Sequence, residues 1–234
     1  MKISVIIPSK NGLHNLQDCL PSVIKATTKA SFETEIIVVD DNSRDGTIET
    51  LPPLFSKVKF VKNPKIGVCS ARNFAVKNSS GNWLLFIDND VFLEEDFFIK
   101  TEKYLQDDIF CVDNKYFLCK KSNFIVLNGF DKIFSLLYSS QIDLIYRGLK
   151  RGWKGILSYK ISQQINQLSA NDYLIFILKN ITSNMLLFRL ILKSFFHLNI
   201  NIFINVFKLY PEIKMKRAEE KANSEILDKE IFNN

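Results

Sequence analysis

The feature that most constrains the fold is a repeated order of apolar runs, each followed by polar side chains and then by a segment with helical spacing. The runs "ISVII" (3–7), "IIVV" (36–39) and "WLLFI" (83–87) are typical of strands buried on both faces. Residues 13–26 have the apolar spacing of a helix, and a second helix is expected from about Val68 to the turn Ser79-Ser80-Gly81. This alternation predicts a mostly parallel α/β sheet flanked by helices and joined by right-handed crossovers.

Polar side chains follow three of the predicted strands. Pro8 to Asn11 follow the run 3–7, Asp40 and Asp41 follow the run 36–39, and Asp88 to Asp90 follow the run 83–87. Ligands of open parallel sheets bind beyond the carboxyl ends of the strands, so these groups should gather at one edge. Two carboxylates one residue apart repel each other, and a divalent cation that also bridges phosphates removes the repulsion. For either acidic cluster alone, a solvated turn or a helix cap is the competing explanation.

Composition and cysteine usage narrow the class of protein. The chain of 234 residues is 47% hydrophobic and 24% charged, which indicates a globular protein. Its four cysteines show no CxxC spacing, which favours reduced thiols in the cytoplasm over a disulfide framework or a metal cluster. The first residues have too short an apolar core for a signal peptide, and no uncharged apolar run reaches about 18 residues.

Several segments together resemble the family 2 glycosyltransferases of the GT-A fold. They are "IIVVDDNSRDGT", "GVCSARNFAVKNSSGNWLLFIDND", "LNGFDKIF" and "DLIYRGLKRGWK", which follow in the family's order over about residues 2–155. The resemblance implies a GT-A-like nucleotide-diphospho-sugar transferase domain over 1–165, with a C-terminal helical extension over 166–234. It also implies a metal-assisted, inverting transfer of sugar from a nucleotide-sugar donor to a glycan or lipid-linked acceptor. "VVDDN" also resembles phosphoacceptor receiver domains, but their acidic pair ends the first strand and their length is about half of this one.

The resemblance assigns roles to matching positions at the predicted edge. Pro8 and Asn11 would wall the nucleobase, and Asp41, with Asp40 beside it, would accept a hydrogen bond from the base. The positions that the resemblance gives to the donor are Pro8, Asn11, Asp40, Asp41, Arg72 and Asp88. Arg72 would reach the nucleotide or its phosphates. Asp88 and Asp90 form the DxD motif of the family, which implies Mg²⁺ or Mn²⁺ at these two residues, with Asp88 also near the ribose.

The segment "SSQIDLIYRGLKRGWK" departs from the family pattern at the residue expected to take the acceptor's proton. Gln141 occupies that position, and glutamine is not a useful base at neutral pH. Asp143 is the nearest carboxylate and is the candidate catalytic residue. It also stands four residues before Arg147 on a predicted helix, which is typical of a structural ion pair. Two functions therefore stay open: an active transferase, or a catalytically impaired nucleotide-sugar-binding or partner-assembly protein.

The C-terminal part of the chain is basic and largely apolar. The net charge of +6 belongs to residues 145–234, and polar residues recur every four positions from Arg189 to Asn205. One interpretation is a helix lying in an anionic membrane surface, which would place the protein peripherally on the inner face of the plasma membrane. The other is a helix hairpin packed on the domain or on a second copy of the chain. No groove-reading or base-stacking pattern appears, so no nucleic-acid partner is expected.

Overall fold

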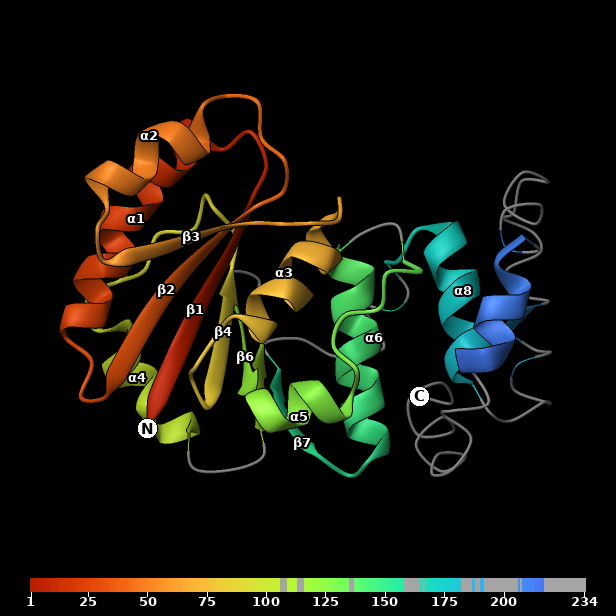
Figure 1. Ribbon diagram of the computed structural model, residues 1–234. Coiled ribbons are helices and arrows are strands. Elements are labelled where there is room, and N and C mark those ends of the chain that lie inside the picture. The colour runs from red at the N-terminus through yellow and green to blue at the C-terminus, as the bar shows by residue number, and fades with distance from the viewer. Residues whose placement is uncertain are drawn as a thin grey trace. The chain divides into compact units, whose positions relative to one another are not determined.

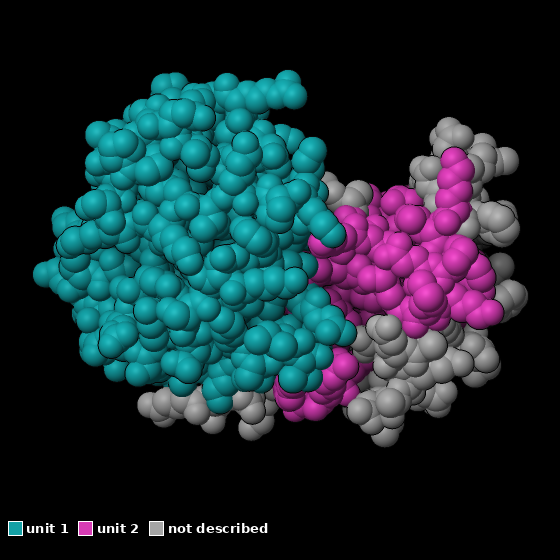
Figure 2. Space-filling model, viewed as in Figure 1, with its two compact units in different colours: residues 1–129, 155–158 teal, residues 130–154, 159–234 magenta. Residues whose placement is uncertain are grey.

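The computed structural model describes residues 1–105, 109–112, 116–134, 137–157, 165, 167–181, 187, 190–191, 206 and 208–216. The chain forms two compact units, which Figure 2 shows in different colours. Unit 1 comprises residues 1–129 and 155–158, and unit 2 comprises 130–154 and 159–234. The domain boundary expected after residue 165 adjoins residues outside the described ranges and stays a prediction.

A seven-stranded sheet with the order β3-β2-β1-β4-β6-β5-β7 forms the centre of unit 1 (Figure 1). The first four strands in the chain pair in parallel, and β6 is antiparallel to both β4 and β5. The mostly parallel sheet predicted from the apolar runs is therefore confirmed. The strands are β1 (Lys2–Ser9), β2 (Glu33–Asp40), β3 (Val58–Lys62), β4 (Trp83–Ile87), β5 (Ile109–Val112), β6 (Tyr116–Lys120) and β7 (Lys154–Leu157).

Helices cover both faces of this sheet. The odd-numbered side chains of β1, among them Ile3 and Val5, share one core with α1 (Leu13–Thr28), α2 (Thr47–Leu54) and α4 (Phe97–Thr101). The helix α3 (Val68–Lys77) contacts β1 and β2, and α5 (Lys121–Val126) places Phe124 on Phe86, a β4 residue outside that core. A short 3-10 turn, η1 (Glu102–Tyr104), follows α4. Successive side chains of a strand point to opposite faces of the sheet, and helices cover both faces here. This explains why the buried strands are apolar throughout and do not alternate with polar residues.

Unit 2 is helical. Its main elements are α6 (Leu137–Lys150), α8 (Ala170–Asn180) and the helical residues 208–216. Tyr146 on α6 meets Phe176 on α8 edge to face, with ring centroids 5.0 Å apart, and Ser169 caps α8 by accepting from the Asp172 N–H. Of the helix expected around Arg189–Asn205, the structure describes only residues 190 and 191, which are helical, and the rest lies outside the described residues. Among the helices that the structure describes, none is long and apolar enough to cross a membrane.

Candidate functional site

The carboxyl ends of β1, β2 and β3 are aligned, and they form what we call the polar edge of the sheet. Ser9 is in register with Asp40, and Asp40 with Lys62. Beyond the ladders, the Asp41 N–H donates to the Ser9 carbonyl at 2.7 Å and the Asn63 N–H donates to the Asp40 carbonyl at 2.8 Å. The parallel register therefore places the polar residues that follow each strand next to one another.

Asp41 is buried at the polar edge, and its carboxylate is held by two groups. Its Oδ1 accepts from Asn63 Nδ2 at 2.7 Å, and the Gly67 N–H lies 2.9 and 3.0 Å from its two oxygens. Gly67 has a φ of +118°, which a residue with a Cβ rarely adopts and which turns this N–H toward Asp41. Asp41 is thus an oriented acceptor, as recognition of a nucleobase N–H requires.

The loops after β1 and β2 bond to each other through Asn11. Its N–H donates to Ser43 Oγ at 2.8 Å, and its Oδ1 accepts from the Arg44 N–H at 2.8 Å. The Asp40 carboxylate accepts from the Ser43 N–H at 3.2 Å, which fixes the second loop from inside. Asn11 adopts a left-handed φ of +51°, which asparagine tolerates better than most residues. The two loops therefore form one wall beside Asp41.

Arg72 and Asp88 pair across the same edge. Arg72 Nη2 lies 2.6 Å from Asp88 Oδ1, and the arginine side chain is 3% exposed whereas the aspartate side chain is 60% exposed. Burial lowers the pKa of Arg72, while the charge of Asp88 acts in the opposite direction. Arg72 also lies over the Phe86 ring, 5.6 Å from its centroid. A buried cation thus meets Asp88, the first aspartate of the expected DxD motif.

The second aspartate of the motif, Asp90, is exposed beside a buried thiol. The Cys19 thiol donates to the Val91 carbonyl at 3.1 Å. Burial raises the pKa of Cys19 to about 12, and the charge of Asp90 adds to the rise. The thiol therefore stays protonated, and remains a donor, at neutral pH.

Asp88 and Asp90 fit the needs of a hard divalent cation. Both are exposed carboxylates one residue apart, and Mg²⁺ typically takes one or two carboxylates together with phosphate oxygens and water. Within the described ranges, no group of three or more His, Cys, Asp or Glu residues could hold a metal by itself. The two aspartates thus suit a cation that is shared with a bound diphosphate.

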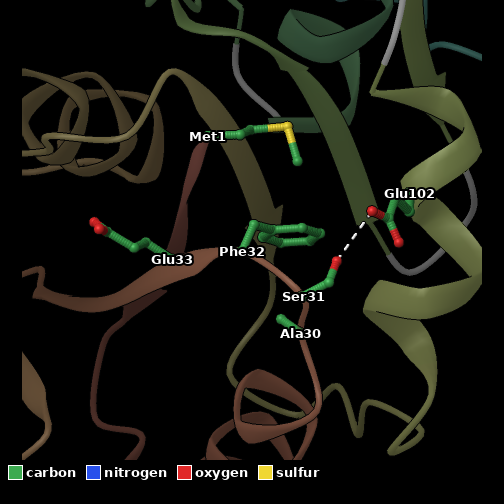
Figure 3. A pocket seen from close by; sticks show the side chains of 6 residues that line it. All are labelled: Met1, Ala30, Ser31, Phe32, Glu33 and Glu102. Carbon is green, nitrogen blue, oxygen red and sulfur yellow. Dashed lines mark hydrogen bonds between the residues drawn. The ribbon is translucent and has the colours of Figure 1, made fainter.

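Two cavities of unit 1 are lined by residues outside the polar edge. One cavity of about 610 Å³ lies at the opposite end of the strands, where Met1, Phe32 and Glu102 line it (Figure 3). Ser31 donates to Glu102 across it at 3.0 Å. A second cavity, of about 500 Å³, extends from Val91 away from the motif. Neither holds two aspartates and an arginine, so the chemistry of the side chains, rather than cavity size, locates the candidate site.

Asp143, the candidate catalytic residue, is fully buried within unit 2. Arg147 Nε donates to its Oδ2 at 2.8 Å, while Lys179 Nζ and Asn180 Nδ2 donate to its Oδ1 at 2.6 and 2.8 Å. Burial alone would raise the pKa of Asp143, but the charges of Arg147 and Lys179 outweigh it and hold the pKa below its usual value. The predicted ion pair with Arg147 is confirmed, whereas the role of Asp143 as a base stays a prediction.

Sequence reasoning missed several residues that support the predicted ones. Asn63 and Gly67 orient Asp41, and Ser9 Oγ accepts from Asn89 Nδ2 at 2.9 Å. Asn63 follows β3, so the rule that selected the ends of the other strands would have found it. Nothing in the sequence indicates the partners of Gly67 and Asn89, because these contacts arise only when the loops meet in space.

Residues 4–152 match the model of glycosyl transferase family 2. Several curated glycosyltransferases match stretches of 90 to 110 residues at 30 to 36% identity. One is the Escherichia coli UDP-Glc:alpha-D-GlcNAc-diphosphoundecaprenol beta-1,3-glucosyltransferase WfgD, which is 36% identical over 38% of this chain and 34% of its own. The chain spans only 10 to 34% of the length of these relatives.

Two solved structures show the fold. S. aureus TarS in complex with UDP-GlcNAc superposes with a TM-score of 0.57 at 17% identity, over 76% of this chain and 65% of TarS. The mannosyltransferase PcManGT from Pyrobaculum calidifontis, in complex with GDP-Man and Mn²⁺, gives a TM-score of 0.54 at 17% identity, over 76% and 61% of the two chains. These likenesses confirm the GT-A fold that the sequence motifs led us to expect.

Proposed function

The chain belongs to glycosyl transferase family 2, and on that premise we propose that it transfers a sugar from a nucleotide-sugar donor to an acceptor hydroxyl. The observation that carries the proposal is that Asp41 and the Arg72–Asp88 pair both lie at the carboxyl ends of parallel strands. This is the place where open α/β sheets bind nucleotides.

Each part of the polar edge has a role in the proposed donor complex. Pro8, near the end of β1, and Asn11, in the wall, contact the nucleobase. Asp41, with Asp40 beside it, accepts a hydrogen bond from the base. Arg72 reaches toward the phosphates, and Asp88 toward the ribose. Because Asn63 and Gly67 already orient the Asp41 carboxylate, binding would cost little reorganisation.

In this proposal Asp88 and Asp90 hold Mg²⁺ or Mn²⁺. When bound, the cation would supply positive charge where the departing nucleoside diphosphate gains negative charge. Arg72 supplies a second, permanent positive charge from its buried position beside Asp88. The Mn²⁺ and GDP-Man in the PcManGT structure support such a pairing of metal and nucleotide within this fold.

Calorimetry of UDP binding tests the donor site. We expect the full chain to bind UDP in the presence of Mn²⁺, and binding to weaken strongly in EDTA or in the Asp90→Ala variant, because the diphosphate would lose its bridging cation. Lys100→Ala serves as a matched surface control, since Lys100 contacts only Glu94 and Asp96 among the described residues. Equal affinity with Mn²⁺ and with EDTA would refute the metal assignment.

We further propose that the acceptor is a glycan or a lipid-linked sugar and that the transfer inverts the anomeric centre. The name of WfgD, whose acceptor is a diphosphoundecaprenol-linked sugar, supports a lipid-linked acceptor. The basic C-terminal part would suit contact with an anionic membrane surface near such a lipid. Two further statements stay predictions: that nucleic acid is not a partner, and that the chain can form a homo-oligomer.

A second function, donor binding without efficient transfer, is favoured by one observation. Gln141 stands at the expected base position, and the neighbouring Asp143 is fully buried with three donors on its carboxylate. An ionised carboxylate held in this way is a poor proton acceptor. The chain would then act as a nucleotide-sugar-binding or partner-assembly protein, and measurement of UDP release from UDP-sugars distinguishes the two functions.

A further inference from the structure

Both neighbours of Asp90 are bonded to the beginning of the chain. On one side, Asn89 Nδ2 donates to Ser9 Oγ at 2.9 Å. On the other, the Val91 carbonyl accepts from the Cys19 thiol at 3.1 Å. The residues before and after Asp90 are therefore fixed, while the carboxylate of Asp90 itself is exposed.

Gly12 lies close to the contact between Asn89 and Ser9. A Cβ placed on Gly12 would collide with both Asn89 Nδ2 and Ser9 Oγ. Gly12 directly precedes α1, so the loop that carries Asp88 and Asp90 rests closely on the start of this helix. The absence of a side chain at Gly12 thus permits the close approach of the two loops.

The segment 91–95 then runs along α1 through two further contacts. Ser22 Oγ accepts from the Leu93 N–H at 3.2 Å, and Lys25 pairs with Glu95 at 2.5 Å. Lys25 and Glu95 are both largely exposed, so their pair contributes little. The hydrogen bonds made by Cys19 and Ser22 are partly buried, and the two residues follow one another along a single face of the helix.

The start of α1 is also fixed to the proposed nucleotide side of the site. Its first residue, Leu13, donates its N–H to Asp45 Oδ2 at 2.8 Å. Asp45 directly follows Ser43 and Arg44, which bond to Asn11. One helix therefore connects the proposed nucleobase wall to the proposed metal aspartates at a fixed separation.

We propose that Cys19 and Ser22 are positioning residues, which hold Asp90 where it and the diphosphate can share one cation. This inference rests on the proposed donor site and adds to it two residues that never touch the donor. Because Asp90 is exposed, side-chain packing does not fix its position, and the contacts of the flanking backbone must do so. Partners that orient metal ligands in this way typically change metal affinity by roughly 10- to 100-fold when they are removed.

The test compares Ser22→Ala with Thr27→Val in the full chain. Both variants remove a hydroxyl that donates at 2.7 Å to the carbonyl three residues earlier in α1, but only Ser22 also contacts the segment 91–95. We expect Ser22→Ala to weaken UDP binding in Mn²⁺ by about 10-fold, with UDP binding in EDTA unchanged. Thr27→Val should behave as the wild type in both conditions.

A second readout needs no nucleotide. Amide hydrogen exchange of residues 91–95, measured in metal-free protein, should be faster in Ser22→Ala and unchanged in Thr27→Val. Cys19→Ala should weaken UDP binding in Mn²⁺ and speed exchange at residues 91–95, as Ser22→Ala does. Cys19→Ser should bind UDP in Mn²⁺ as the wild type does, because it keeps a donor for the Val91 carbonyl.

The outcomes separate the two proposals. A wild type whose UDP affinity does not respond to Mn²⁺ overturns the proposed metal site, and the positioning role with it. A wild type that responds, with Ser22→Ala and Thr27→Val equally affected, overturns the positioning role alone. Unchanged exchange at residues 91–95 in Ser22→Ala likewise overturns it, whereas loss of the Mn²⁺ response in that variant alone supports it.

Discussion

At the scale of single residues, the outstanding question is the proton acceptor. Gln141→Asp restores a carboxylate at the position where the family resemblance expects the base. A positioned base contributes about 100- to 10,000-fold to a rate, so we expect this variant to release UDP from its cognate UDP-sugar, with acceptor present, faster than the wild type. Equal turnover by both proteins would contradict the assignment of position 141.

Asp143→Asn is the companion variant. The pair with Arg147, which the sequence suggested, is buried and extends to Lys179. A neutral residue at position 143 would therefore remove one carboxylate from two buried cations. Breaking a buried pair costs about 3–5 kcal/mol, so we expect a large loss of unfolding free energy in urea. A folded, stable variant that has lost only its turnover would instead identify Asp143 as the base.

At the scale of secondary-structure elements, ion pairs hold α6, α8 and the last described helix together. Lys179 on α8 lies 2.6 Å from Asp143 and 3.0 Å from Asp131, and Lys216 lies 2.6 Å from Asp131. Burial would raise the pKa of Asp131, but the charges of Lys179 and Lys216 outweigh it and lower the pKa to about 2. These ion pairs add to the apolar contact between Tyr146 on α6 and Phe176 on α8.

The direction of the Asp131 shift predicts acid sensitivity. Because the folded pKa lies below the unfolded value of about 3.9, the stabilisation is complete above pH 4 and is lost as the pH falls toward 2. For this one group the loss is on the order of 2 kcal/mol. Urea unfolding followed by circular dichroism between pH 2 and 7 measures it, and a pH-independent midpoint below pH 4 would contradict the role of the pairs.

Lys179→Met and Lys100→Met make a matched comparison for the same experiment. Each lysine contacts two carboxylates, at 2.6 and 3.0 Å, but the Lys179 side chain is 3% exposed and the Lys100 side chain 59%. We expect Lys179→Met to destabilise the protein at pH 7 by about 3–5 kcal/mol, since two buried carboxylates would lose their shared cation. Lys100→Met should leave the stability nearly unchanged, because its ion pairs are exposed to solvent.

At the scale of the whole molecule, apolar patterning determined most of what could be predicted. Continuous apolar runs identified β1, β2 and β4, and the topology of parallel strands then placed Asp40, Asp41 and Asp88 at one edge. The partners of these residues could not be predicted, because they depend on how loops and helices meet. Cys19 is an example: its sequence context indicates only a helical core position, and its contact with Val91 lies 72 residues away.

The basic C-terminal part gives a prediction at the same scale. If it contacts membranes, the full chain should sediment with vesicles that contain anionic lipid at low salt, and less so at 1 M salt, where the Debye length falls to about 3 Å. The described helix at 208–216 exposes Lys208, Tyr210, Lys214 and Met215, a mixture suited to such a surface. Equal sedimentation with neutral vesicles would contradict the role of the positive charge, and no sedimentation at low salt would favour the packed hairpin.

The pairing of charges that are distant in the sequence also affects the order in which the two units can fold during synthesis. Strands β1 to β6 have all emerged by residue 120, so the parallel part of the sheet can form early. Asp143, by contrast, waits for Lys179 and Asn180, which follow it by 36 and 37 residues, and Asp131 waits 85 residues for Lys216. Until those cations leave the ribosomal exit tunnel, burial of the two carboxylates is unfavourable. We therefore expect α6 to stay exposed in the nascent protein, where a chaperone could bind it.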